Sequence, residues 1–267
     1  MIKKITWPIV MTLFLFILSC DLSDLMNPSE SVNNAAYSAS ASFSYDFAQD
    51  HKNQVVINAI NSTITLAGRS DLSSIKIWGE RIVKSESEAD AAHNLEKLET
   101  IITNAANELI IETKQPSDSD GREYLVNYHL TIPATWNASI KIINGTVDID
   151  SLSGDIGLQM VNGEIQLQEI SGNLSTKLTN GKVDCKMRLP QNGACQITAI
   201  NAEIQLLIPQ NTSAHFAVGV INGSVSVSNL NIQNVQQEFN FVNGTLGTGQ
   251  GTIKVEAING AISVRGY

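Results

Sequence analysis

Apolar and polar residues alternate along most of the second half of the chain. A polar residue separates Ile140 from Ile142, and another separates Val147 from Ile149 a few positions later. A period of two with one apolar side is typical of strands that bury one face of a sheet. The pattern therefore predicts an all-β protein in which many short strands cover a shared core.

A five-residue motif recurs between these strands: apolar, Asn, small, any residue, aliphatic. From Asn144 to Asn259, successive motif asparagines lie 18, 18, 21, 21, 21 and 16 residues apart, a regularity that a chance scatter would not hold. Ser62 and Ala202 stand where the other copies have Gly. The asparagines expected at structural turns are Asn61, Asn144, Asn162, Asn180, Asn201, Asn222, Asn243 and Asn259.

Two folds fit this pattern. Asn-Gly between alternating strands favours hairpins, and hence an antiparallel β-sandwich. Repeats of about 20 residues, none of which can bury its apolar face alone, favour a β-solenoid. We expect a single-chain solenoid similar to a parallel β-helix, with the sandwich as the alternative. In a solenoid the asparagines would stack at one corner and hydrogen-bond to each other, which makes them structural.

The segment before the repeats is less regular. Alternation predicts strands at 55–66 and 75–83, and a short helix at 85–98 begins with a capping box. Strands at 99–103 and 108–113 form a predicted hairpin.

The first 19 residues have the pattern of a signal peptide. Lys3 and Lys4 precede an apolar run that is too short to span a bilayer. Residues 17–20, Ile-Leu-Ser-Cys, resemble the lipobox of bacterial lipoproteins. This resemblance implies that cleavage leaves Cys20 as the first residue and that fatty acids such as palmitate acylate it. An ordinary secretory signal with a chance Cys is the alternative.

The remaining chain divides into a tether and one body. Residues 20–43 are rich in Ser, Asn, Ala and Asp and have no periodicity, as expected for a flexible tether. Residues 44–267 form the predicted solenoid, with a less regular part at 44–131 and tandem repeats at 132–267. Asp21 resembles the signal that keeps enteric lipoproteins on the inner membrane, so it favours that membrane over the outer one.

Composition excludes several classes of protein. The chain has 267 residues, 43% of them hydrophobic, and only three cysteines, which excludes intrinsic disorder and a disulfide scaffold. The net charge is −9, and loss of residues 1–19 with their two lysines makes it −11. Nucleic acid is therefore not an expected partner, because phosphate binding needs clustered basic residues.

A search for catalytic or metal-binding residues gives no candidate pair. The four histidines lie far apart: His51, His93, His129 and His215. Asp148, Asp150, Asp155 and Asp184 are the densest carboxylates, and they raise the alternatives of a calcium site or an acid/base pair. Gln166 and Gln205 occupy the matching positions of other repeats and cannot serve as acid or base. We therefore expect a solvated polar row, and no catalytic, cofactor or metal site.

Two further residue types bear on function. Sugar-binding platforms use exposed aromatic residues, but Phe216, Phe239 and Phe241 all fall in the inward phase of the repeats. Cys185 and Cys195 also fall in the inward phase. In an exported protein they form either a disulfide or two small buried thiols.

The ordered set of features resembles a known family. The lipobox, the tether, the early helix and hairpin, and Ile132-Pro133 precede tandem Asn-Gly turns, with Leu152–Ile156 and Ile170–Leu174 between them. Together they resemble a family of bacterial β-solenoid envelope proteins, a domain of unknown function whose members are described as candidate adhesins. The likeness covers about residues 45–267. It implies a parallel-stranded solenoid without known enzymatic activity and without a cofactor.

We therefore expect a lipid-anchored, non-enzymatic interaction or adhesion module of the bacterial cell envelope, facing the periplasm or the exterior. Its expected partners are the membrane, through the anchor, and an envelope protein or glycan. A carbohydrate-active enzyme on a β-helix is one alternative. A self-assembling envelope scaffold is another, because the chain reaches Tyr267 just after its last strand without a polar cap, which would favour end-to-end association.

Overall fold

A computed structural model of the chain describes residues 35–267. The predicted signal peptide and Cys20 lie outside these residues. Residues 33–267 form a compact unit of their own, which holds the whole hydrophobic core and every strand pairing of the described residues. None of its helices is long and apolar enough to span a membrane.

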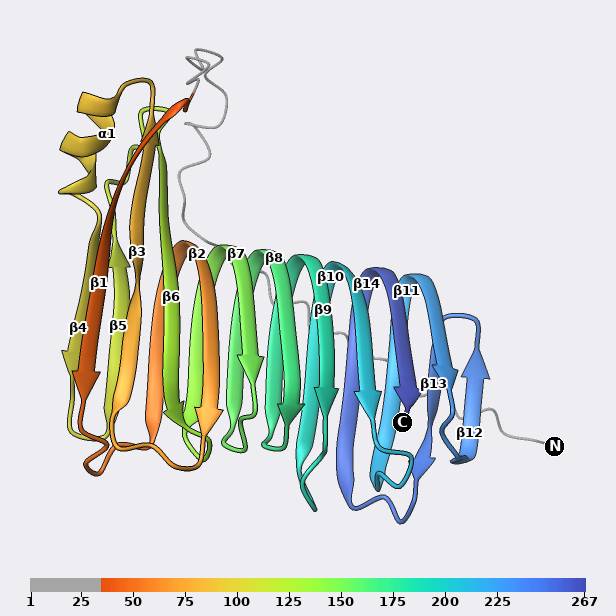
Figure 1. The fold of residues 1–267 in the computed structure, drawn as a ribbon. Coiled ribbons are helices and arrows are strands. Elements are labelled where there is room, and N and C mark those ends of the chain that lie inside the picture. The colour runs from red at the N-terminus through yellow and green to blue at the C-terminus, as the bar shows by residue number, and fades with distance from the viewer. Residues whose placement is uncertain (1–34) are drawn as a thin grey trace. The chain divides into compact units, whose positions relative to one another are not determined.

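The unit is a β-solenoid with one short helix, and the solenoid prediction is confirmed over the sandwich (Figure 1). Its elements are β1 (Tyr37–Phe47), β2 (Gln54–Arg69), β3 (Ile75–Ser85), α1 (Glu88–Leu95), β4 (Glu99–Asn104), β5 (Glu108–Lys114), β6 (Glu123–Pro133), β7 (Asn137–Asp150), β8 (Ile156–Ile170), β9 (Leu174–Met187), β10 (Ala194–Ile208), β11 (Ala214–Ser228), β12 (Ile232–Glu238), β13 (Phe241–Leu246) and β14 (Gly251–Gly266).

Each coil of the solenoid is one long strand that turns a corner at its motif Asn. Figure 1 shows these strands rising on one side, bending over the top and descending on the other. We call the residues before the corner Asn of each coil the leading face, and the residues after it the trailing face. Successive coils pair in parallel and in register, so that Asn144 lies beside Asn162 and Asn162 beside Asn180.

The core lies between the two faces. Ile140 and Ile142 of the leading face and Val147 and Ile149 of the trailing face are all at most 4% exposed. The coils β8 to β11 and β14 add further inward side chains of the same kind, because the alternation points every second residue of both faces inward. A single apolar core therefore runs through all the coils.

The asparagines at the corners form a hydrogen-bonded ladder. Each side-chain amide donates from Nδ2 to Oδ1 of the neighbouring asparagine, over distances of 2.6 to 2.9 Å. Asn61, at the start of the ladder, donates to the carbonyl of Tyr124. In spatial order the ladder contains Asn61, Asn144, Asn162, Asn180, Asn201, Asn259 and Asn222.

The coil order departs from the sequence order at one place. β14, the last strand of the chain, lies between β10 and β11 and pairs in parallel with both. β12 and β13 form an antiparallel hairpin whose β13 pairs with the leading half of β11. β14 buries alternate residues along both halves and so needs a neighbour on each side, whereas β12 is exposed along nearly its whole length and suits an edge.

Two expectations from the repeat pattern are corrected by this hairpin. Asn243 lies within β13, opposite Ala217 of β11, and is no corner residue. The end of the solenoid is formed by β11, β13 and β12, so the strand before Tyr267 is no uncapped end. The sequence motif of residues 242–246 fits both a corner and a hairpin strand, and only the long-range pairing decides between them.

The part before the repeats extends the two faces separately. β5 pairs with the leading half of β2, and β4 pairs with β5. On the trailing face β6 pairs with β2, β3 with β6, and β1 with β3. β1 begins at Tyr37, so it overlaps the segment 20–43 that was expected as a tether. Its alternate residues face the body, and the ring centroid of Phe43 lies 5.7 Å from that of Tyr128.

The helix α1 is shorter than the predicted range 85–98. Ser87, and not Ser85, is its N-cap and accepts a hydrogen bond from the backbone N–H of Asp90. Arg122 donates hydrogen bonds to both carboxylate oxygens of Asp90. These bonds tie the loop before β6 to the helix, and they hold the pKa of Asp90 well below its usual range. This charge-assisted pair is bidentate, the strongest form of such a contact.

We predict that Asn162→Ala lowers the free energy of unfolding by about 1 to 2 kcal/mol, because it removes one donated and one accepted ladder bond. Chemical denaturation of residues 33–267 measures the change. Asn243→Ala is the matched control: Asn243 is equally exposed but stands outside the ladder. Equal losses for the two variants would contradict a stabilising role of the ladder.

Candidate functional site: a groove on the leading face

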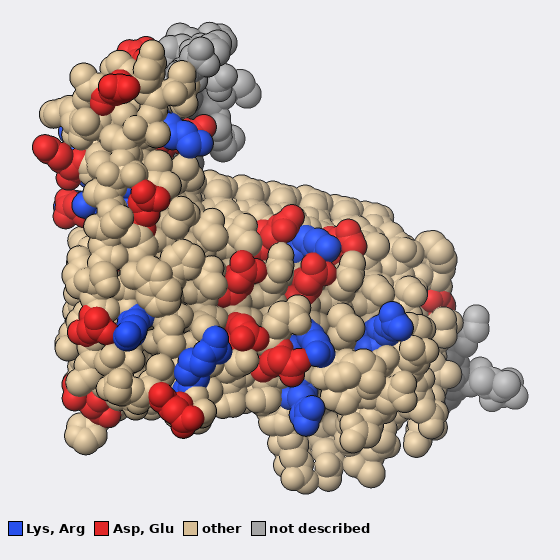
Figure 2. Space-filling view, viewed as in Figure 1, with Lys and Arg blue, Asp and Glu red and all other residues tan. Residues whose placement is uncertain are grey.

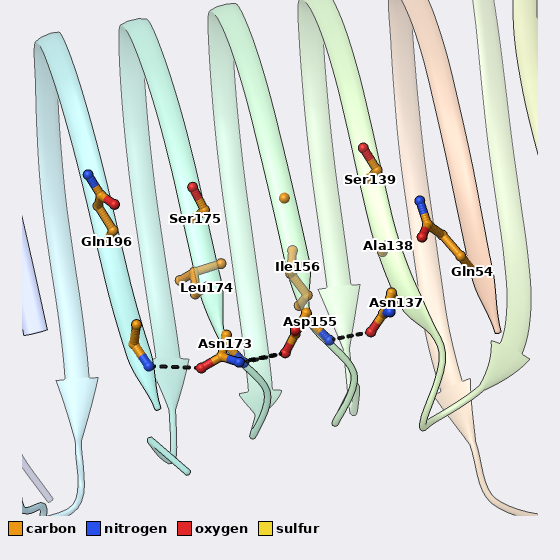
Figure 3. A pocket seen from close by; sticks show the side chains of 12 residues that line it. Gln54, Asn137, Ala138, Ser139, Asp155, Ile156, Asn173, Leu174, Ser175 and Gln196 are labelled. Atoms are coloured by element: carbon orange, nitrogen blue, oxygen red, sulfur yellow. Dashed lines mark hydrogen bonds between the residues drawn. The ribbon is translucent and has the colours of Figure 1, made fainter. Parts of the chain in front are cut away.

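A groove with a volume of about 400 Å³ lies on the leading face of the body. It crosses the first halves of β7, β8, β9 and β10, so that four neighbouring coils build it (Figure 3). Gln54 of β2 and Gln196 of β10 stand at its two ends. The groove therefore runs along the solenoid axis, across the strands.

The floor of the groove is made of very small residues. Ser139, Gly157 and Ser175 are register neighbours on β7, β8 and β9. A Cβ atom built on Gly157 would meet no heavy atom within 4 Å. The hollow exists because these three neighbouring residues have small side chains or none. Other outward positions of the same coils carry the longer side chains of Lys, Gln or Glu.

One wall is a ladder of side chains that accept hydrogen bonds from the following coil. Asn137 Oδ1 accepts from the backbone N–H of Asp155, at 2.8 Å, and Asp155 Oδ1 accepts from the backbone N–H and Nδ2 of Asn173. Asn173 Oδ1 in turn accepts from the N–H of Ala194. Figure 3 shows these side chains in one line. The wall is rigid because each member is fixed by the next.

The opposite wall carries longer side chains. A second, smaller hollow of about 70 Å³ shares the floor residues and is lined by Lys141, Gln159 and Lys177. Lys141 and Gln159 thus place an ammonium and a carboxamide donor beside the groove, and Ser139 and Ser175 place hydroxyls on its floor.

The groove lacks the residues of a reaction centre. Asp155 is its single carboxylate, and it is already engaged in the wall. Among residues 35–267 there is no group of three His, Cys, Asp or Glu side chains that could hold a metal ion.

The carboxylates that the sequence singled out are divided between the faces. Asp155 lies in the groove, whereas Asp148 and Asp184 lie on the trailing face with Gln166 between them in register. Burial and the nearby Glu164 raise the pKa of Asp148. Asp184 forms an ion pair of 3.0 Å with Lys182.

Charges of both signs mix on the trailing face. Figure 2 shows Lys and Arg interspersed with Asp and Glu over the central coils. Arg69 lies 3.7 Å from Asp150, and Lys186 pairs with Glu169, which lowers the pKa of that carboxyl. Such local compensation leaves no strong patch of one sign to attract a charged polymer.

Two aromatic residues are exposed although the repeat pattern did not predict it. Trp78 is 42% exposed and stacks on His129, with ring centroids 5.5 Å apart, at the outer surface of β3 and β6. This pair lies before the repeats, outside the segment in which the repeat phase predicts inward aromatic residues. Phe239 was expected to face inward, but it is 79% exposed because it lies at the turn between β12 and β13.

Cys185 and Cys195 are both buried and both carry free thiols, so the disulfide alternative is not formed in the structure. Burial raises the pKa of Cys195 to about 12 and that of Cys185 well above its usual value. Because the thiolate is the reactive form, neither residue is suited to act as a nucleophile.

We predict that neither thiol of native residues 33–267 reacts with an alkylating reagent near neutral pH, and that both react after unfolding without reductant. Mass spectrometry of the alkylated protein counts the labels. An unfolded protein that stays unlabelled until a reductant is added would instead demonstrate the disulfide.

Comparisons with known proteins agree with this architecture. Residues 127–265, just over half of the chain, match the family described as Toastrack DUF4097. This range begins in β6 and contains all the coils from β7 onward. A comparison with curated proteins gave no match.

A solved structure shows the same fold. A candidate cell adhesion protein from Clostridium sporogenes superposes with a TM-score of 0.50 at 15% sequence identity, covering 86% of this chain and 100% of that protein. A candidate adhesin from Bacteroides fragilis has a TM-score of 0.31 at 7% identity, covering 84% and 97%. The resemblance read from the turn motifs is confirmed by the family match: the chain belongs to the Toastrack DUF4097 family.

Proposed function

We propose that the protein is a lipid-anchored, non-enzymatic interaction or adhesion module of the bacterial cell envelope, and that the groove on the leading face holds its partner. The observation that carries the proposal is the groove itself. Its rigid wall, open floor and row of donors provide recognition, and its one carboxylate is already engaged. The descriptions of the two structural neighbours as candidate adhesion proteins are compatible with this role.

The groove favours an extended, polar partner. It runs across four coils and is shallow, so it accommodates a chain lying along the solenoid. The Lys and Gln side chains of one wall donate hydrogen bonds to carbonyl, hydroxyl or carboxylate oxygens. Envelope proteins and envelope glycans both present such groups.

The anchor belongs to the same proposal. Cleavage before Cys20 and acylation of its sulfur and amino group would hold the body at a membrane, with the segment up to β1 as the connection. Each buried CH₂ group contributes about 0.8 kcal/mol, so several acyl chains hold the protein stably. Asp21 favours the inner membrane in bacteria that sort lipoproteins by this residue.

We predict that Gly157→Gln lowers the capture of envelope partners by residues 33–267 by about tenfold, a loss of about 1.4 kcal/mol. The new side chain would fill the groove, and the open space around Gly157 accommodates it without straining the fold. Quantitative pull-down from envelope extracts, with protein and glycan fractions assayed separately, measures the capture.

The control for this experiment is Gln166→Glu on the trailing face, which leaves the groove unchanged. Unchanged thermal unfolding of both variants shows that folding is intact. Equal capture by Gly157→Gln and the wild type would exclude the groove as the binding site. Release of reducing ends from envelope polysaccharides would instead indicate an enzyme.

We predict that Cys20→Ala moves the full chain from the membrane fraction to the soluble exported fraction, because acylation requires the cysteine sulfur. Immunoblots of fractionated cells measure the distribution. Cys195→Ala, which removes a different cysteine from the buried core, serves as the control and stays with the membrane. A Cys20→Ala variant that still sediments with membranes would disprove the anchor.

A further inference from the structure

One tryptophan occupies a polar row on the outer surface of the trailing face. Trp78 of β3 is 42% exposed, whereas Ile77 beside it points inward and is 0% exposed. The register row of Trp78 crosses the strands from β1 to β9, and its other members are all polar: Ser44, His129, Thr65, Asp148, Gln166 and Asp184. Packing of the core therefore does not account for a large apolar ring at this outward position.

The indole ring of Trp78 is covered on one side only. It stacks on the imidazole of His129, with ring centroids 5.5 Å apart and planes 20° from parallel. His129 lies beside Trp78 on β6, whereas the register neighbour on the other side of β3 is Ser44 of β1. Because a serine side chain is too short to cover an indole ring, the second face of Trp78 is open above β1. The stack with His129 fixes the orientation of this open face.

Polar side chains surround the indole ring on both flanking strands (Figure 1). On β3 itself, the outward neighbours are Lys76 and Glu80, two positions before and after Trp78. Six further outward residues lie in register with these three: Ser42, Ser44 and Asp46 of β1, and Asn127, His129 and Thr131 of β6. We call Trp78 and these eight residues the Trp78 patch. Each neighbour of the ring thus carries a hydroxyl, carboxylate, amide, ammonium or imidazole group.

This combination of groups matches the surface of a sugar ring. A pyranose has a face of C–H groups, which stacks on an aromatic ring, and a rim of hydroxyl groups, which need hydrogen-bond partners. The open face of Trp78 suits the C–H groups. The hydroxyls of Ser42 and Ser44 and the carboxylates of Asp46 and Glu80 suit the rim. An apolar partner would instead bury these polar groups without hydrogen bonds, which is unfavourable.

The charges of the Trp78 patch favour a neutral glycan over an acidic one. Asp46 and Glu80 place carboxylates on either side of Trp78 along the strands, against the one ammonium group of Lys76 in the patch. The whole chain carries a net charge of −9. An acidic polysaccharide would be repelled at this surface, whereas carboxylates accept hydrogen bonds from neutral hydroxyls.

We propose that the Trp78 patch is a second binding site of the body, which takes one unit of a neutral glycan stacked on the open face of Trp78 above Ser44. This site lies on the trailing face and the groove lies on the leading face, so the two bind independently. The proposal does not require the groove to hold a partner. A body with both sites can bridge a glycan and a second envelope component.

Trp78→Ala tests the proposal on an array of neutral and acidic oligosaccharides. We expect residues 33–267 to retain a neutral oligosaccharide, and the variant to bind it about tenfold more weakly, because the stacking surface is lost. Phe239→Ala is the control, since Phe239 is an aromatic residue that is 79% exposed outside the patch. Gly157→Gln in the groove should also leave this binding unchanged, which separates the proposal from the one for the groove.

Ser44→Arg blocks the site without removing the tryptophan. Its long side chain would lie over the open face of Trp78, so we expect it to weaken sugar binding about tenfold as well. Ser40→Arg is the matched control, because Ser40 is equally exposed on the same strand but lies outside the patch. Unchanged thermal unfolding of each variant shows that folding is intact.

Sugar binding also has a spectroscopic signature. Residues 33–267 contain two tryptophans, Trp78 and Trp136, and Trp136 is only 4% exposed. Iodide therefore quenches mainly the fluorescence of Trp78, and a bound sugar should protect it.

An array on which no oligosaccharide is retained would overturn the proposal. So would retention that Trp78→Ala and Ser44→Arg leave unchanged, a bound sugar that leaves the quenching unchanged, or binding of acidic glycans alone. Capture of an envelope protein that depends on Trp78, without any bound sugar, would assign the patch to a protein instead.

Discussion

The close approach of successive corners is the constraint on which this structure depends. A Cβ atom on Gly163 would lie 1.8 Å from the carbonyl oxygen of Gly145, and Gly181 stands in the same relation to Gly163. These glycines adopt φ values near +140°, a region that other residues rarely occupy. The corners can therefore stack at strand spacing, and the adjacent asparagines meet at hydrogen-bonding distance. In-register pairing of both faces, and hence the continuous core, follows from this stacking.

The ladder also explains why two corners without glycine remain in place. Ser62 and Ala202 hold the small position beside Asn61 and Asn201, and both asparagines still join the ladder. Neither residue has a positive φ, so each corner there uses a conformation that an L side chain tolerates. Ser62 is buried with its hydroxyl unpartnered, which is a cost that the flanking coils offset.

The repeat spacing and alternation were enough to predict the solenoid, its corner residues apart from Asn243 and its inward side chains apart from Phe239, because these depend on local pattern. The position of β14 and the role of Asn243 were not predictable in this way, since they depend on which distant strands pair. The groove escaped prediction for a related reason. Ser139, Gly157 and Ser175 are unremarkable in sequence and form a floor only when the register places them side by side.

The insertion of β14 between β10 and β11 has a consequence for the order of folding. β10 and β11 have no direct pairing and meet only through β14, whose residues follow those of both. Coils up to β10 can add one after another as the chain is synthesised. β11 and its hairpin then have no partner until residues 251–266 have emerged. We therefore expect assembly to stall with β10 as a temporary edge, and to finish in one late step that places β14, β11 and the β12–β13 hairpin together.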